Sequence, residues 1–156
     1  MKGNQQLTKT LNSLLADELT AINQYMVHSE MCDNWGYKKL AALTTRRAIE
    51  EMKHAEHLME RILFLDGMPD VETMPKIVAG ANVEEQFHAD LESEKAAIVS
   101  YNQGIATCRK AGDDGSADLL KTNLQDEERH ADYLETQLSL IQQIGLANYL
   151  SQTMGE

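Results

Sequence analysis

The sequence is poor in the residues that interrupt helices or cross-link a chain, with two prolines and two cysteines among 156 residues. Cys32 and Cys108 lie far apart and in no metal-ligand spacing, which argues against a structural zinc site. We expect both to be free thiols of a reducing cytoplasm, although their number alone leaves one disulfide open.

Basic residues are also scarce, since 14 lysines and arginines stand against 25 acidic residues and leave a formal net charge of −11. Such a chain should repel nucleic acid and anionic membranes, and it should attract cations. No stretch is long and apolar enough to span a bilayer, and residues 1–9 are too polar for a secretory signal. We therefore expect a cytoplasmic protein that binds neither nucleic acid nor membrane.

The few glycines and prolines divide the chain into helical segments. Breaks fall at residues 34–36, 66–69 and 112–115 and at Gly145. They leave four long helices, expected at about 5–34, 37–65, 83–111 and 116–144, and a short fifth at about 146–153. Each long helix would measure about 45 Å at 1.5 Å per residue, which is normal for a four-helix bundle.

The lengths of the connections predict the topology. The first and third are short and join antiparallel neighbours, whereas the middle one, about 66–82, is long enough to cross the length of a bundle. No low-complexity linker indicates a second domain. We predict a single domain over residues 1–156: an all-α, ferritin-like four-helix bundle with a long crossover between helices two and three and a short C-terminal fifth helix.

Two Glu-x-x-His motifs indicate a metal site. Glu51 with His54, and Glu127 with His130, are spaced so that both side chains of a pair share one helix face, about one turn apart. Either motif alone is weak evidence, because helices rich in Glu and His produce this spacing by chance.

Two lone glutamates strengthen the pattern. Glu18 precedes Glu51 by the same separation as Glu94 precedes Glu127 (51 − 18 = 127 − 94), so the chain consists of two halves with a constant offset (94 − 18 = 127 − 51). Each half supplies one lone Glu and one Glu-x-x-His, which is the ligand set of di-iron and di-manganese sites in ferritin-like bundles. The candidate catalytic and metal ligands are therefore Glu18, Glu51, His54, Glu94, Glu127 and His130.

Apolar residues at helical spacing place these candidates on the core side of their helices. Glu18 and Glu94 fall inside the stripes of the first and third helices, and the fourth stripe brackets Glu127 and His130. The stripe of the second helix is poorer, because Arg47 interrupts it. Burying an ionised carboxylate without compensation costs several kcal/mol, so we expect cations to neutralise the four carboxylates.

The composition of the site indicates its chemistry. Four carboxylates match the charge of two divalent cations, and one histidine per metal suits iron or manganese. We expect Glu51 and Glu127 to bridge the metals, and a lone glutamate and one histidine to cap each. The site fits a ferroxidase, in which O2 or H2O2 accepts two electrons as iron is oxidised. A structural di-metal site that only joins helices is the alternative.

Three further residues near the motifs have two interpretations each. Tyr25 and Tyr101 share the stripes of the lone glutamates, where core packing with a hydrogen-bonded hydroxyl is commoner than a redox role. Met52 follows Glu51 and is turned about 100° away from the ligand face, towards a neighbouring subunit. From its position alone, Met52 is more typical of a residue that packs in a subunit interface than of a thioether ligand.

Six short runs carry a family resemblance: Met1-Lys2-Gly3, Ala21-Ile22-Asn23-Gln24-Tyr25, Asp33-Asn34-Trp35-Gly36, Glu51-Met52-Lys53-His54-Ala55, Glu60-Arg61-Ile62-Leu63-Phe64-Leu65 and Gly145-Leu146-Ala147-Asn148-Tyr149-Leu150. With them the chain resembles the bacterioferritins over nearly its whole length. The resemblance implies iron storage and detoxification in a 24-subunit cage built of dimers, with Fe(II) oxidised at di-iron centres within subunits. It also implies haem b, held between two subunits by Met52 of each, and a bacterioferritin-associated ferredoxin as reductant.

One departure from the family concerns an accessory iron site on the inner face. Bacterioferritins often carry a His and an acidic residue just before the second-helix motif, whereas here Arg46 and Arg47 occupy the place of the His and a neighbouring Glu, and Glu50 supplies the acid. Because a cationic side chain repels Fe(II), we predict that iron enters and leaves the cavity through the di-iron centre itself.

Three other classes of protein compete with this interpretation. Rubrerythrin-like peroxidases usually add an iron domain built on four cysteines, and this chain has two. Mini-ferritins that coat DNA place iron ligands across subunit interfaces and often carry a basic tail, whereas here one acidic chain holds the complete set. A purely structural bundle leaves six matched ligands unexplained.

Overall fold

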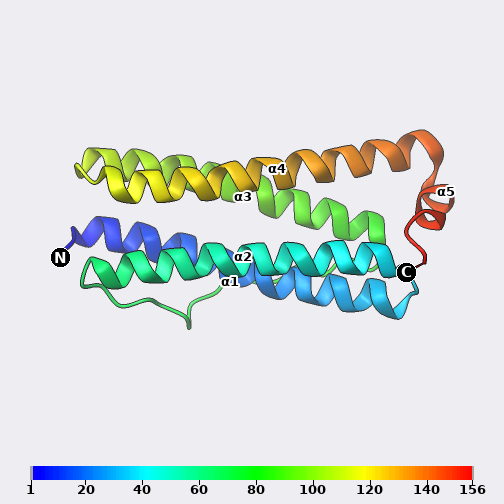
Figure 1. Cartoon of the computed structure of the whole chain (residues 1–156), viewed down its shortest axis with the longest axis horizontal. Helices are drawn as coiled ribbons and strands as arrows, with labels where there is room; N and C mark the ends of the chain where they lie inside the picture. Colours follow the sequence, from blue (N-terminus) through cyan, green and yellow to red (C-terminus); the bar gives the residue numbers. More distant parts are fainter. Residues whose placement is uncertain (1, 156) are drawn as a thin grey trace.

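The computed structural model describes residues 2–155. Its helices are α1 (Gln5–Asn34), α2 (Lys38–Phe64), α3 (Val83–Lys110), α4 (Asp114–Ile144) and the short α5 (Leu146–Ser151). No strand occurs among the described residues. The predicted all-α fold, with four long helices followed by a short fifth, is confirmed (Figure 1).

The helix boundaries agree with the expected ones to within a few residues, and α4 shows the clearest difference. It begins at Asp114 and not near residue 116, because the Asp113 carboxylate accepts a hydrogen bond from the backbone N–H of Ser116 and caps the helix. Gly115, which looked like part of a turn, lies inside the first turn of α4. Asn4 and Asn82 cap α1 and α3 in the same way.

The helices form two side-by-side pairs, α1 with α2 and α3 with α4, and α5 lies across one end of the bundle (Figure 1). The anchor of α5 is Tyr149, which is buried with its ring centroid 5.9 Å from that of Phe87. The Tyr149 hydroxyl donates to Gln137 Oε1 over 2.7 Å. The fifth helix therefore closes the end of the bundle where α3 begins.

The crossover segment, residues 65–82, runs along α1 from its first half to its second. Near the start, Asn12 Nδ2 donates to the Met68 carbonyl over 3.1 Å. Near the end, the Gly80 N–H donates to His28 Nε2 over 3.1 Å, and the other ring nitrogen of His28 lies 3.1 Å from Asp90 Oδ2 on α3. Because the segment spans the bundle, α3 is antiparallel to α1, as the connection lengths predicted.

The apolar core is divided into two clusters. One occupies the end of the bundle where α1 begins, and it contains Leu11, Leu15, Leu58, Ile62 and Leu120. The other lies towards α5 and contains Leu40, Phe87, Leu91, Leu134 and Ile141. Between these clusters lie buried polar and charged side chains, and this middle layer holds the candidate site.

Both cysteines are buried free thiols, as expected. None of the helices described between residues 2 and 155 combines the length and the apolar composition of a membrane span.

Candidate metal centre

All six candidate ligands project into the middle layer of the bundle, and each is 2 % exposed or less. Each long helix contributes either a lone glutamate or a Glu-x-x-His pair. The side chains form two overlapping groups, in each of which the candidate ligand atoms lie within 4.8 Å of one another. The first group is Glu18, Glu51, His54 and Glu127, and the second is Glu51, Glu94, Glu127 and His130.

The two motifs face each other across the bundle. His54 Nδ1 on α2 lies 2.7 Å from Glu127 Oε1 on α4, and His130 Nδ1 on α4 lies 2.8 Å from Glu51 Oε1 on α2. His130 Nδ1 is also 3.3 Å from Glu94 Oε1. Glu51 and Glu127 belong to both groups, which is the position that bridging ligands would require.

The cluster contains polar atoms with no hydrogen-bond partner. Among the described residues, every buried side-chain nitrogen or oxygen without one belongs to the six candidates: Glu18 Oε2, Glu51 Oε1 and Oε2, His54 Nδ1, Glu94 Oε2, Glu127 Oε1 and His130 Nδ1. Buried polar groups are normally paired, because an unpaired one costs about 1–3 kcal/mol. Carboxylate oxygens and imidazole nitrogens gathered this closely suit a pair of divalent cations.

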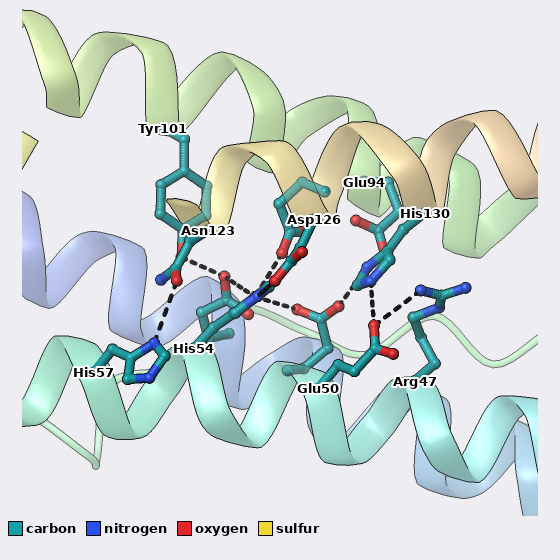
Figure 2. A network of polar contacts seen from close by, with 12 residues as sticks. Arg47, Glu50, His54, His57, Glu94, Tyr101, Asn123, Asp126 and His130 are labelled. Atoms are coloured by element: carbon teal, nitrogen blue, oxygen red, sulfur yellow. Dashed lines mark hydrogen bonds and ion pairs between the residues drawn. The ribbon is translucent and has the colours of Figure 1, made fainter. Parts of the chain in front are cut away.

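A second layer of carboxylates holds the histidines. His54 Nε2 lies 2.8 Å from Asp126 Oδ2, and His130 Nε2 lies 2.6 Å from Glu50 Oε2 (Figure 2). Each Nε2 donates to the carboxylate beside it, and each Nδ1 faces the cluster, where it can present a lone pair to a cation once its proton is displaced. This arrangement orients metal-binding histidines and raises their basicity.

Two tyrosines contact the lone glutamates, and each contact joins α1 to α3. The Tyr101 hydroxyl donates to Glu18 Oε1 over 2.5 Å, and the Tyr25 hydroxyl donates to Glu94 Oε1. The tyrosines show the same offset as the glutamates that they contact (101 − 25 = 94 − 18). Burial and the adjacent glutamate raise the pKa of each tyrosine well above its usual value, so both hydroxyls keep their protons.

Electrostatics favours protons in the cluster when no cation is present. Burial, with repulsion from the neighbouring carboxylates, raises the pKa of Glu18 and that of Glu127 well above the usual value. Burial would lower the pKa of His130, but the Glu51 and Glu94 carboxylates beside its Nδ1 raise it to about 9. Burial would also lower the pKa of His54, but three carboxylates beside its Nδ1 raise it well above its usual value. Cations that enter the cluster must therefore displace protons.

A groove of about 700 Å³ reaches the cluster between α1, α3 and residues 75–80 of the crossover segment. Glu18, Glu94 and Glu127 line it, together with Asp17 and Glu92. A small cation or oxidant could approach the candidate ligands by this route, where carboxylates attract cations and Lys76, which also lines the groove, repels them.

Sequence reasoning identified the inner set of residues but not all of their supports. Asp126 was missed, and Glu50 was considered only for an accessory iron site, whereas its carboxylate contacts His130 and accepts from Arg47 over 3.1 Å. A signal was present, because each is the acidic residue directly before a motif glutamate. Met52 lies outside the cluster, 44 % exposed on α2.

Comparisons with known proteins agree with this geometry. The ferritin-like domain model matches residues 8–144. Bacterioferritin of Mycobacterium bovis is 45 % identical over 152 residues, covering 97 % of this chain and 96 % of the relative. Bacterioferritin of Streptomyces coelicolor is 44 % identical, covering 97 % and 90 %, and that of Brucella melitensis is 42 % identical, covering 96 % and 92 %.

Proposed function

Because the chain belongs to the bacterioferritin family of ferritin-like proteins, we propose that it stores iron and that the six-residue cluster is a ferroxidase centre. The cluster lies within the ferritin-like domain matched over residues 8–144, and we propose that the chain has no second domain. Fe(II) is the substrate: two ions bind per chain, are oxidised to Fe(III), and are deposited as ferric mineral.

The electron balance matches the number of metal positions. Two Fe(II) ions release two electrons, which with two protons reduce O2 to H2O2, or H2O2 to two water molecules. The cluster holds protons in the metal-free state, and it releases them as cations enter. Its two histidines and four carboxylates hold two cations close together, so that both electrons can pass to one oxidant.

One observation supports this proposal above the others: the unpartnered buried atoms among the described residues all belong to the six candidate ligands. A structural bundle would satisfy such atoms with hydrogen bonds. A di-metal site that only joins helices would need the same ligands, but it would not need the groove that reaches Glu18, Glu94 and Glu127. The groove favours a site that exchanges metal and admits an oxidant.

The test is an anaerobic Fe(II) titration of the apoprotein followed by O2 or H2O2, with ferric absorbance as the readout. We expect two Fe(II) per chain and fast oxidation, and we expect Glu18→Ala and His130→Ala to abolish the fast phase. Glu128→Ala is the matched control, because Glu128 adjoins Glu127 but is exposed. Tight binding of two ions without oxidation would contradict the ferroxidase proposal and indicate a structural di-metal site.

We also propose haem b at the outward face of α2, with Met52 as axial ligand from each of two chains. The Met52 side chain is 44 % exposed, and Ile49, one turn away, is equally exposed, so a thioether lies on an apolar surface that suits a haem. Bound haem would carry electrons from a bacterioferritin-associated ferredoxin to the ferric mineral. Met52→Leu should abolish the haem Soret band and leave Fe(II) oxidation unchanged.

The assembly proposed is a 24-subunit cage built of dimers. Beyond the anchor at Tyr149, α5 leaves Leu146 and Leu150 only partly buried, and Ile144 and Met154 are exposed. These apolar groups favour packing against other copies of the chain. Deleting residues after Gly145 should therefore weaken assembly in analytical ultracentrifugation. An intact cage of unchanged thermal stability would contradict this expectation.

Iron should reach the cavity through the di-iron centre and not by way of an accessory site at Glu50. The Glu50 Oε2 atom already contacts His130 and Arg47, and the Arg47 guanidinium repels Fe(II). Fe(II) found beside Glu50 in crystals soaked with iron would count against this route.

A further inference from the structure

The two ends of the cluster differ behind their tyrosines. Asn123 Nδ2 donates to the Tyr101 hydroxyl over 3.2 Å, and Asn123 Oδ1 lies 3.4 Å from His57 Nδ1 (Figure 2). By the offset that relates Glu18 to Glu94, Arg47 corresponds to Asn123 and His57 corresponds to Tyr133 (123 − 47 = 133 − 57 = 94 − 18). Equivalent positions of the two halves therefore carry the same residue types at the candidate ligands and the tyrosines, but different residue types at these two positions.

The contacts at the Tyr101 end run in one direction. The Tyr101 hydroxyl donates its single proton to Glu18 Oε1, so its oxygen accepts from Asn123 Nδ2. The amide oxygen of Asn123 then faces His57, which makes His57 Nδ1 the donor. Asn123 is 1 % exposed, so the amide is held inside the bundle. This chain of donors fixes the direction of the Tyr101 hydroxyl.

The Tyr25 end has a different arrangement. Arg47 donates to Glu50 and lies with Cζ 5.6 Å from the centroid of the Tyr133 ring. A cavity of about 30 Å³, lined by Tyr25, Arg47 and Tyr133, occupies this region. The tyrosine that holds Glu94 thus adjoins a small cavity, whereas the tyrosine that holds Glu18 adjoins a buried amide.

The arginines reinforce the difference. Arg47 pairs with Glu50, which contacts His130, and the Arg47 side chain is 19 % exposed. Arg129 pairs with Asp126, which contacts His54, but its side chain is 67 % exposed. A less exposed guanidinium is less screened by solvent, so Arg47 opposes a cation near His130 more strongly than Arg129 opposes one near His54.

We propose that Asn123 and His57 are positioning residues that hold the Tyr101 hydroxyl on Glu18, and that they make the Glu18–His54 metal position the tighter of the two. The fixed hydroxyl occupies Glu18 Oε1 and leaves Oε2, which has no hydrogen-bond partner, for the metal. This position fills first, and the Glu94–His130 position fills second. The inference rests on the proposed di-metal function and concerns the order of binding, not oxidation.

The test is an anaerobic Co(II) titration of the apoprotein, followed by calorimetry and by the visible Co(II) absorption bands. Wild type should show two steps with affinities at least about tenfold apart. Asn123→Leu, which removes the donor at similar volume, should weaken the first step by about tenfold and leave the second unchanged, in the range seen when outer-shell partners of metal ligands are removed. Tyr25→Phe should weaken only the second step.

A second pair of variants separates positioning from general damage to the fold. His57→Leu should weaken the first step, whereas His57→Gln, which keeps an N–H donor, should restore much of it. Glu56→Gln, at the exposed position next to His57, should change neither step. Equal weakening of both steps by Asn123→Leu would indicate a merely structural role and overturn the proposal.

The titration also distinguishes this inference from the proposed function. Two equal Co(II) steps in wild type would overturn the inference and leave a di-metal ferroxidase intact. Binding of fewer than two Co(II) per chain would overturn both.

Discussion

The imidazole of His130 on α4 lies with Nε2 2.6 Å from Glu50 Oε2 on α2, so the residue before one motif supports the histidine of the other. Asp126 supports His54 in the same crossed manner, at 2.8 Å. Neither Nε2 atom is held by a carboxylate from its own half of the chain. The geometry of each candidate metal position therefore depends on how α2 and α4 pack against each other.

Removing the Glu50 carboxylate should weaken metal binding without removing a ligand. Glu50→Leu leaves His130 Nε2 unpaired, and we expect a loss of about 10–100-fold in Co(II) affinity at the Glu94–His130 position. Glu50→Gln keeps an acceptor oxygen for His130 and should lose far less. Calorimetric titration of the apoproteins measures both, and equal affinities for wild type and Glu50→Leu would show that the contact has no influence on the metal.

Metal binding should release protons and strengthen as the pH rises. At pH 7 the apoprotein holds protons in the cluster, because the pKa of His130 is raised to about 9 and those of His54, Glu18 and Glu127 are also raised. Cations must displace these protons, so Co(II) affinity should increase between about pH 6 and 8. Titrations in two buffers of different ionisation enthalpy count the protons, and an affinity independent of pH would contradict the assignment.

Neutralising one candidate ligand should stabilise the metal-free protein. A folded-state pKa of Glu127 above its unfolded value means that stability is lost as the pH rises through the folded pKa. At pH 7 Glu127→Gln should therefore raise the free energy of unfolding of the apoprotein, by about 1–4 kcal/mol. With Co(II) in excess, wild type should become more stable than Glu127→Gln, because wild type gains binding energy that the variant lacks. Thermal unfolding with and without Co(II) measures both effects.

The start of α4 should contribute stability that is lost in acid. Partial burial would raise the pKa of Asp113, but hydrogen bonds from Ser116 and Arg61 hold it below its usual value. The stabilisation is thus complete above the unfolded pKa of about 4 and disappears as the pH falls through the lower folded pKa. Asp113→Ala should cost about 1–3 kcal/mol at pH 7.

The matched variant Asp113→Asn keeps a helix cap but loses the charge opposite Arg61. It should be intermediate in stability at pH 7 and should not show the loss of stabilisation below pH 4. Urea unfolding at pH 7 and pH 3 provides the measurement. If the free energies of unfolding of wild type and Asp113→Asn differed by the same amount at pH 7 and at pH 3, the Arg61 pair would not stabilise the fold.

The sequence predicted the bundle and the six side chains that gather in its middle layer, because both depend on periodicity within single helices. Glu18, Glu94 and the two motifs lie on apolar stripes, and the length of residues 65–82 required a crossover. The start of α4 was misplaced because Gly115 resembled a turn, whereas the cap at Asp113 determines where the helix begins.

The supporting residues could not be found in the same way. Glu50 and Asp126 lie about 100° around the helix from the ligand beside them, and their partners belong to a different helix. Asn123 and His57 also contact each other across two helices. Such pairs follow only from the packing of α2 against α4, which no single-helix pattern specifies.

The constant offset between the two halves determines how the site can be altered. If two identical two-helix hairpins associated to form it, every substitution would appear twice and both metal positions would change together. Here one continuous polypeptide carries both hairpins, so each position can be tuned alone. The exchange of Asn123 and His57 for Arg47 and Tyr133 between the halves is such a change. An engineered chain with the same pair at both ends should bind the two cations with equal affinity, and a chain with the pairs exchanged should reverse the proposed order.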